Sequence, residues 1–271
     1  DAMITSFQAS SGFNSLYFPP TAAAGPEDVV LMFDPTLNIT QSNLSSLSTP
    51  YVAGDFTFHQ MMYVRGGAGA YLNFQAENIP GTLWALETAF DDNGTTTGDI
   101  TIGNTNGPLL NAEYPTDTWF KITFEIDLSN NNWEVFIDGQ TFGSFANTIN
   151  KIASLDLYTR IGDEFYVDDV CYSYTPATLP LNNGQVSNIS PIAGLVGQVR
   201  YPSVEIRNFG TDPIYSCDVT FDYNGTQITE NLTNISTGFG LLSLNSMQVD
   251  FSNSITLITG TNTGTVTISN V

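Results

Sequence analysis

The sequence predicts an all-β protein built from two consecutive β-sandwich domains. Along most of the chain, apolar and polar residues alternate over short segments, which is the period of a strand with one buried face. Clusters of Gly, Pro, Asn and Asp separate these segments, and none of the segments shows a sustained helical period. About ten strands at this spacing within roughly 175 residues are typical of a two-sheet sandwich.

The most regular segment, residues 118–142, predicts an antiparallel meander. Apolar residues alternate with polar ones through residues 120–126 and again through residues 133–137. An Asn-rich turn separates these two strands, and Asp138 and Gly139 predict a tight turn into a third strand.

The other strands of the first domain follow from the same alternation. We expect them at residues 29–33, 55–64, 70–76 and 82–90, near Ile100 and Leu109, and at residues 164–174. Because residues 29–33 are continuously apolar, that strand is expected to be buried on both faces. In the strand at residues 82–90, Trp84 is expected to face the core together with Leu86 and Phe90.

A second all-β domain, residues 181–271, is expected after the first domain, residues 1–175. Clustered prolines and small residues interrupt the strand pattern between them and predict a linker at residues 176–180. The expected strands of the second domain are residues 203–207, 214–223, 227–232, 243–251 and 264–269. Their size and rhythm are immunoglobulin-like, without the Cys-Trp-Cys core of antibody domains.

The charge balance is strongly acidic. Charged residues make up 12% of the chain, against about 25% in ordinary globular proteins. Six Lys and Arg against 27 Asp and Glu give a formal charge of −21, which disfavours nucleic acid and anionic membrane surfaces and favours cations as partners. The same charge also keeps a secreted protein soluble. A surface rich in Asn, Thr, Ser and Gly suits a secreted, extracellular or cell-surface location.

Cysteine use and hydropathy give weaker indications. Cys171 and Cys217 fall in strands of different domains and are expected to be two separate buried thiols. No run of about 18 apolar residues occurs, so membrane insertion is not expected. No cleavable signal pattern opens the chain, so an export signal would have been removed or lie upstream, and the strand-like end at Val271 suggests a fragment of a longer protein.

Several motifs resemble known secreted modules. In the first domain, Trp119-Phe-Lys-Ile, Asn132-Trp-Glu-Val-Phe-Ile-Asp-Gly139 and Phe165-Tyr-Val-Asp-Asp-Val170 resemble concanavalin A-like jelly-roll modules of laminin-G or pentraxin type. The likeness is greatest to modules in large secreted proteins of Bacteroidota. In the second domain, Val204-Glu-Ile-Arg-Asn-Phe-Gly-Thr211 and Val219-Thr-Phe-Asp-Tyr-Asn-Gly225 resemble the bacterial adhesion-related immunoglobulin-like repeat.

This resemblance implies a two-sheet jelly-roll sandwich followed by a smaller immunoglobulin-like β-sandwich. It also implies export by the type IX system and a role as an adhesin, or as an ancillary module beside enzymes. A glycan or a surface protein would be the lasting partner, and the secretion machinery a partner during export. A structural spacer or export cargo with no ligand of its own is the alternative.

The resemblance further implies a structural calcium ion. In similar sugar-binding sandwiches, an acidic pair in the last strand meets an acidic group from the first strands. Asp168 and Asp169 match that pair, with Glu27 and Asp28 as possible partners, and calcium accepts such oxygen ligands. The loop Asp91-Asp92-Asn93 is a second oxygen-rich segment, although such residues are also typical of turns.

A glycan-binding surface is expected on the outer faces of the first domain. With the apolar strand residues in the core, aromatic, amide and carboxylate side chains remain outside, where they can stack on sugar rings and bind hydroxyl groups. The candidates are Tyr71, Asn73, Gln75, Glu87, Trp119 and Glu125. Sandwich sheets also expose such mixtures where they bind no ligand.

Catalysis is not expected from the sequence. Glu125 and Asp127 resemble the start of the Glu-x-Asp-x-x-Glu strand of jelly-roll endoglucanases, but Ser129 and Asn130 stand where the third carboxylate is needed. His59 is the one histidine, which argues against a catalytic triad and an ordinary zinc site. We therefore expect a non-catalytic binding module, with a degenerate polysaccharide hydrolase or lyase as the alternative.

Overall fold

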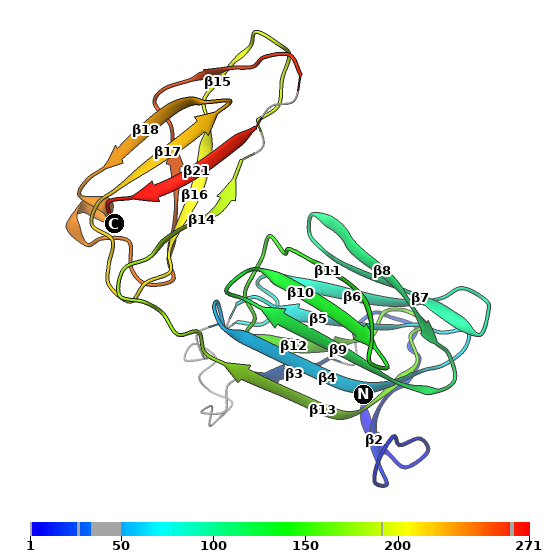
Figure 1. Cartoon of the computed structure of the whole chain (residues 1–271). Helices are drawn as coiled ribbons and strands as arrows, with labels where there is room; N and C mark the ends of the chain where they lie inside the picture. The colour runs from blue at the N-terminus through cyan, green and yellow to red at the C-terminus, as the bar shows by residue number, and fades with distance from the viewer. Residues whose placement is uncertain (1, 26–27, 34–49, 78, 191, 261–262) are drawn as a thin grey trace. The chain divides into compact units, whose positions relative to one another are not determined.

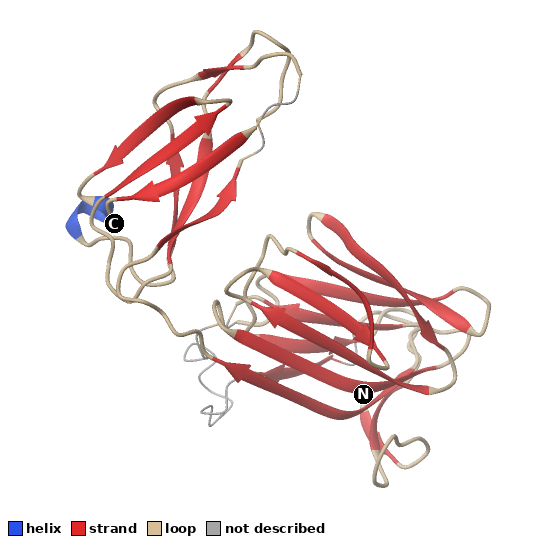
Figure 2. Ribbon diagram, viewed as in Figure 1, coloured by secondary structure: helices blue, strands red, loops and turns tan. Residues whose placement is uncertain are grey.

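The chain divides into two compact units, residues 1–177 and 178–271. The computed structural model describes residues 2–25, 28–33, 50–77, 79–190, 192–260 and 263–271. The predicted linker, residues 176–180, spans the division. Both units are built from strands, and the described residues include one short 3₁₀ helix, Ile235–Gly238 (Figure 2). Within the same described residues, no helix is long and apolar enough to cross a membrane.

The first unit is a sandwich of two antiparallel sheets, as predicted (Figure 1). One sheet has the order β1 (Met3–Thr5), β2 (Ser15–Phe18), β13 (Phe165–Thr175), β4 (Asp55–Val64), β9 (Trp119–Asp127), β10 (Asn132–Ile137), β11 (Gln140–Phe145). The other has the order β3 (Asp28–Met32), β12 (Ser154–Tyr158), β5 (Ala70–Gln75), β6 (Trp84–Asp92), β7 (Thr97–Asn104), β8 (Gly107–Pro115). We call them the seven-stranded sheet and the six-stranded sheet.

The predicted meander is present as β9, β10 and β11. Trp133 pairs with Ile126 across the first turn, and the two side chains are at most 3% exposed. Asp138 and Gly139 have φ values of 50° and 79°, as a tight hairpin turn with a right-handed strand twist requires.

The core of the first unit lies between the two sheets and is rich in aromatic side chains. Phe74 of the six-stranded sheet meets Phe58 and Phe124 of the seven-stranded sheet edge-on, at centroid distances of 5.4 and 5.1 Å. All three rings are fully buried. Because alternate residues of each strand point into this core, the remaining residues form two outer faces, one on each sheet.

Three predictions about burial in the first unit were wrong. Trp84 is 37% exposed, because the register of β5 and β6 shifts between Phe74 and Gln75, and this bulge turns Trp84 to the outer face. Cys171 is exposed, because β13 has a similar irregularity between Asp168 and Cys171. The segment predicted as doubly buried, β3, is an edge strand that pairs with β12, so Val30 is 37% exposed.

The second unit is a smaller β-sandwich. One three-stranded sheet has the order β14 (Gly184–Ile189), β16 (Ser203–Asn208), β19 (Ser246–Asp250). The other has the order β18 (Thr226–Leu232), β17 (Cys217–Tyr223), β21 (Gly264–Ser269). Two short strands, β15 (Val199–Arg200) and β20 (Ile255–Thr256), pair with each other. Val204, Val249, Val219 and Phe221 join the two sheets in one apolar core. Cys217 is buried there as a free thiol, as predicted. The likeness of the second unit to immunoglobulin-like adhesion repeats stays a prediction.

Candidate functional site

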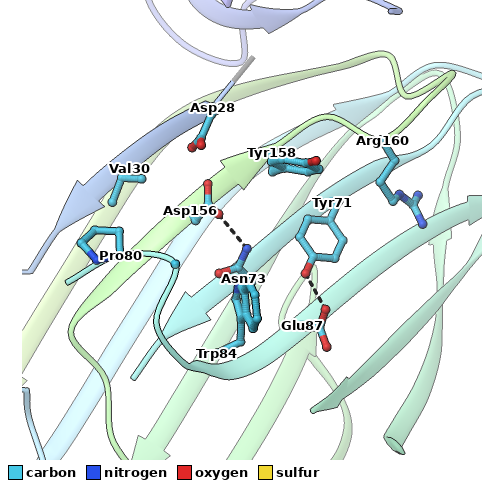
Figure 3. Close-up of a pocket in the computed structure, with 11 residues that line it drawn as sticks. Asp28, Val30, Tyr71, Asn73, Pro80, Trp84, Glu87, Asp156, Tyr158 and Arg160 are labelled. Carbon is cyan, nitrogen blue, oxygen red and sulfur yellow. Dashed lines mark hydrogen bonds between the residues drawn. The ribbon is translucent and has the colours of Figure 1, made fainter. Parts of the chain in front are cut away.

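A pocket lies on the outer face of the six-stranded sheet, over β3, β12, β5 and β6 (Figure 3). Its volume is about 430 Å³. We call it the outer-face pocket. It is lined by Asp28, Val30, Tyr71, Asn73, Pro80, Gly81, Trp84, Glu87, Asp156, Tyr158 and Arg160.

Strand register brings these side chains together. Asp156 on β12 pairs with Asn73 on β5, and Asn73 in turn pairs with Glu87 on β6, so the three form one row across the sheet. Tyr158 pairs with Asp28 in a neighbouring row. Since side chains alternate between faces, residues two apart on one strand also share this face.

A chain of amide hydrogen bonds runs along the floor of the pocket and continues behind it. Asn73 Nδ2 donates to Asp156 Oδ2 at 2.9 Å, and Gln75 Nε2 donates to Asn73 Oδ1. The Gly81 backbone N–H donates to Gln75 Oε1 at 3.0 Å. Asn73 and Gln75 are 1% exposed, so this network is buried and ties the loop at Gly81 to the sheet.

Asp156 is the most unusual group in the pocket. Its side chain is 8% exposed, and Oδ1 has no hydrogen-bond partner among the described residues. Burial raises the pKa of Asp156 to about 7; the hydrogen bond from Asn73 opposes this rise, and the facing carboxylate of Asp28 adds to it. When two carboxyl groups are in contact, ionisation of both is unfavourable unless a cation lies between them, so one of them tends to keep its proton.

Aromatic rings form the walls of the pocket. Tyr71 donates its hydroxyl hydrogen to Glu87 Oε1 at 2.7 Å, and burial followed by this bond raises the pKa of Tyr71. The rings of Tyr71 and Tyr158 meet edge-on with centroids 6.0 Å apart. Trp84, turned outward by the bulge, adds a third ring to the same face.

Arg160 is the one cationic residue among the described residues that line the pocket, and its charge is already paired. Nη1 lies 2.9 Å from Asp91 Oδ1, and Nη2 lies 3.0 Å from Asp163 Oδ1. Nη2 also donates to the carbonyl oxygens of Ala70 and Phe90. The pocket therefore retains the negative character of Asp28, Asp156 and Glu87.

The structure divides the predicted ligand-binding residues between two outer faces. Tyr71, Asn73 and Glu87 line the pocket, and Gln75 lies behind it as a partner of Asn73. Trp119 and Glu125 lie on β9 of the seven-stranded sheet. There the ring of Trp119 packs against Tyr63 at 5.8 Å, and Glu125 pairs with Glu134 of β10. These two residues belong to another surface.

The structure also separates the predicted calcium ligands. Asp168 Oδ2 accepts the backbone N–H groups of Ser10 and Ser11, and Asp169 Oδ1 accepts the Ser11 hydroxyl. Asp28 lies in the outer-face pocket on the other sheet, and the prediction for Glu27 falls outside the described residues. Among residues that the structure describes, no three His, Cys, Asp or Glu side chains form a metal cluster. Asp28 thus lies on a different sheet from Asp168 and Asp169, and calcium stays a prediction.

In the loop at residues 91–93, the side-chain oxygen atoms take part in contacts with nearby residues. Asp91 pairs with Arg160, and Asn93 Nδ2 donates to Asp99 Oδ1 at 3.1 Å. Backbone N–H groups of Gly94 and Thr95 donate to the side chains of Asp92 and Asn93, as is common in turns.

Sequence reasoning missed β12 and with it three of the eleven residues that line the pocket. Asp156, Tyr158 and Arg160 belong to this segment or follow it directly. The signal was present, because Leu155 and Leu157 alternate with polar residues. It was short, since the strand has five residues.

Comparisons with known proteins identify no family for this chain. No protein-family model and no curated protein matches the chain. Among solved structures, the alginate lyase AlyC3 matches 59% of this chain and 75% of its own, with 8% identity and a TM-score of 0.41. The Caenorhabditis elegans galectin LEC-6 matches 47% and 91%, with 9% identity and a TM-score of 0.33. CG-16, a homodimeric agglutinin from chicken liver, matches 54% and 100%, with 15% identity and a TM-score of 0.35.

These comparisons overturn the prediction that the chain is not an enzyme. Alginate lyases recur among the matching structures, one of them from Zobellia galactanivorans. Enzymes as well as lectins use such a sandwich, so the fold excludes neither class, and at these identities it demonstrates neither. The missing carboxylate after Glu125 excludes one endoglucanase arrangement and not catalysis in general.

Proposed function

We propose that the first unit binds a carbohydrate in the outer-face pocket. The observation that carries this proposal is the combination of aromatic walls with a floor of buried amide and carboxylate groups. The faces of Trp84, Tyr71 and Tyr158 suit the apolar faces of sugar rings, and polar groups placed between them suit hydroxyl groups. A pocket of about 430 Å³ has the size of ordinary small-molecule sites.

The negative charge of the pocket favours, as ligands, sugars that carry no acidic groups. Asp28, Asp156 and Glu87 line it, and Arg160 is neutralised by Asp91 and Asp163. A uronate or another acidic sugar would bring a further negative charge close to these carboxylates, where repulsion is strong.

Binding is tested by retention of the purified chain on immobilised polysaccharides, neutral ones beside alginate. We expect retention on a neutral polysaccharide, none on alginate, and loss of retention for Trp84→Ala. Failure of the folded protein to bind any of them, or unchanged retention of Trp84→Ala, would contradict the proposal. The same mixtures are analysed for cleavage products, because the fold is compatible with binding alone and with catalysis.

The finer parts of this proposal are a Bacteroidota source, export by the type IX system, and display at the cell surface as an adhesin stabilised by calcium. Their support is the sequence resemblance. Cell fractionation with an antibody against the chain tests the location. A melting temperature that rises with calcium and falls with a chelator would support the ion, and identical melting temperatures would contradict it.

A further inference from the structure

The outer-face pocket has more negative charge than its own cation can balance. Three carboxylates line it, and the guanidinium of Arg160 is occupied by Asp91, Asp163 and two carbonyl oxygens. Among the described lining residues, no other side chain is cationic. A ligand with a positive charge would therefore enter a complementary field.

The unpaired charge is concentrated where Asp28 faces Asp156. Asp156 is more than nine-tenths buried, and its Oδ1 has no donor among the described residues although Oδ2 accepts from Asn73. A buried polar atom without a partner is costly and marks a place where a donor is needed. Figure 3 shows the Asp28 carboxylate next to that of Asp156.

An ammonium group satisfies this arrangement better than a hydroxyl group does. It carries three N–H donors and a positive charge, so it can bridge both carboxylates and still contact water. Asp28 is exposed at the start of the edge strand β3, so its side chain can turn to admit such a group. The rings of Trp84 and Tyr158 line the same pocket, and aromatic faces attract cations.

We propose that the outer-face pocket selects amino sugars and holds their ammonium group between the carboxylates of Asp28 and Asp156. This inference rests on the proposed carbohydrate binding and names the chemical class of the ligand. It requires both carboxylates, and it predicts that a neutral sugar of the same shape binds less tightly.

Three disaccharides with the same β-1,4 backbone test it: the glucosamine disaccharide, its di-N-acetylated form, and cellobiose. They differ at C2, which carries an ammonium, an acetamido or a hydroxyl group. Affinities are measured by calorimetry or NMR at moderate salt and pH 7, where the ionised form of Asp156 is well populated. We expect the glucosamine disaccharide to bind at least about tenfold more tightly than cellobiose.

Asp28→Asn and Asp156→Asn should each reduce this preference to less than about threefold while cellobiose binding persists, which shows that the pocket is intact. Glu113→Gln is the matched control, because it removes a carboxylate from the exposed face of β8 outside the pocket. Its preference for the amine should equal that of the wild type. A loss equal to that of Asp156→Asn would mean that overall charge, and not the pocket, attracts the amine.

Equal affinity for all three disaccharides would overturn the amino-sugar inference and leave carbohydrate binding standing. Tighter binding of the acetylated form would also overturn it, as would calcium binding that requires Asp156 and displaces the amine. Absence of binding for all three, together with failure on the polysaccharide panel, would contradict the proposed function itself.

Discussion

Asn73 and Asp156 are direct cross-strand partners on β5 and β12, joined by a 2.9 Å hydrogen bond from the Asn73 amide to a buried carboxylate. They are 83 residues apart in the chain. The amide is held in turn by Gln75, whose own side chain binds the loop at Gly81. The position of the Asp156 carboxylate in the pocket therefore depends on this pair and on the side chain of Gln75 that supports it.

The Asn73→Ala substitution should raise the pKa of Asp156 further. The amide hydrogen bond favours the ionised carboxylate, so its loss leaves burial and the Asp28 charge unopposed. We also expect the free energy of unfolding to fall by about 1–3 kcal/mol, because buried polar groups lose a partner. NMR titration of the Asp156 carboxyl carbon measures the first effect. Asn111→Ala on the exposed part of β8 is the control, and an unchanged or lower pKa in Asn73→Ala would refute the argument.

Asp156 should make the stability of the first unit depend on pH. Its pKa is 3.8 in an ordinary environment and about 7 in the folded protein, so the native state keeps a proton that the unfolded chain loses. Its contribution to stability is fully present below about pH 4, decreases as the pH rises, and is lost above about pH 7. The Asp156→Asn substitution keeps the shape of the side chain and removes its negative charge.

We therefore expect Asp156→Asn to match the wild type in stability at pH 4 and to exceed it by about 1–4 kcal/mol at pH 8. Urea denaturation at both pH values, followed by tryptophan fluorescence, tests this, since all three tryptophans of the chain lie in the first unit. Glu113→Gln serves as the control for loss of one negative charge. A variant less stable than the wild type at pH 8 would show that the carboxylate is well compensated.

Trp84→Ala should weaken carbohydrate binding by about 2- to 13-fold, because an aromatic stacking contact contributes on the order of 0.5–1.5 kcal/mol. The unit should stay folded, since the side chain is 37% exposed. Trp119→Ala is the matched control, with the same substitution on the outer face of the other sheet. Affinity electrophoresis on the retaining polysaccharide compares them. If Trp119→Ala is the weaker binder, the ligand surface lies on the seven-stranded sheet.

Gly54→Ala should destabilise the first unit more than Gly67→Ala does. Both glycines have positive φ, 99° and 82°, so both substitutions carry a backbone penalty of about 1 kcal/mol. A Cβ atom at Gly54 would also collide with the carbonyl oxygen of Thr175, whereas nothing lies within 4 Å at Gly67. We expect losses of about 3 and about 1 kcal/mol in thermal or urea unfolding. Equal losses of stability in the two variants would mean that the backbone at Thr175 moves to make room for the Cβ atom at position 54.

Much of the fold was predictable from local pattern. The alternation in residues 120–126 and 133–137 identified two strands, their buried faces and the following turn, because one side of each strand must leave water. The same rule failed at Trp84, where a bulge reverses the alternation, and at β3, where apolar residues occupy an edge. Bulges and edges depend on the partner strand, which the local sequence does not specify.

The candidate site was predictable in part. Tyr71, Asn73 and Glu87 were identified because residues opposite to core residues must face outward. Asp156 and Tyr158 were not, because a five-residue strand gives a weak signal. Trp119 and Glu125 were grouped with the pocket residues although they lie on the other sheet, since alternation tells inside from outside and not one outer face from the other.

The sequence by itself thus determined the all-β class, the strands of the meander and the buried faces of those strands, because these follow from hydrophobic periodicity within single strands. Strand order and register decided which of the outward-facing residues come together in the pocket. They placed β12 between β3 and β5, so that Asp28, Asp156 and Asn73 meet on one face. Contacts between segments so far apart in sequence arise when the sheet closes, and the raised pKa of Asp156 follows from the burial and the neighbours it acquires there.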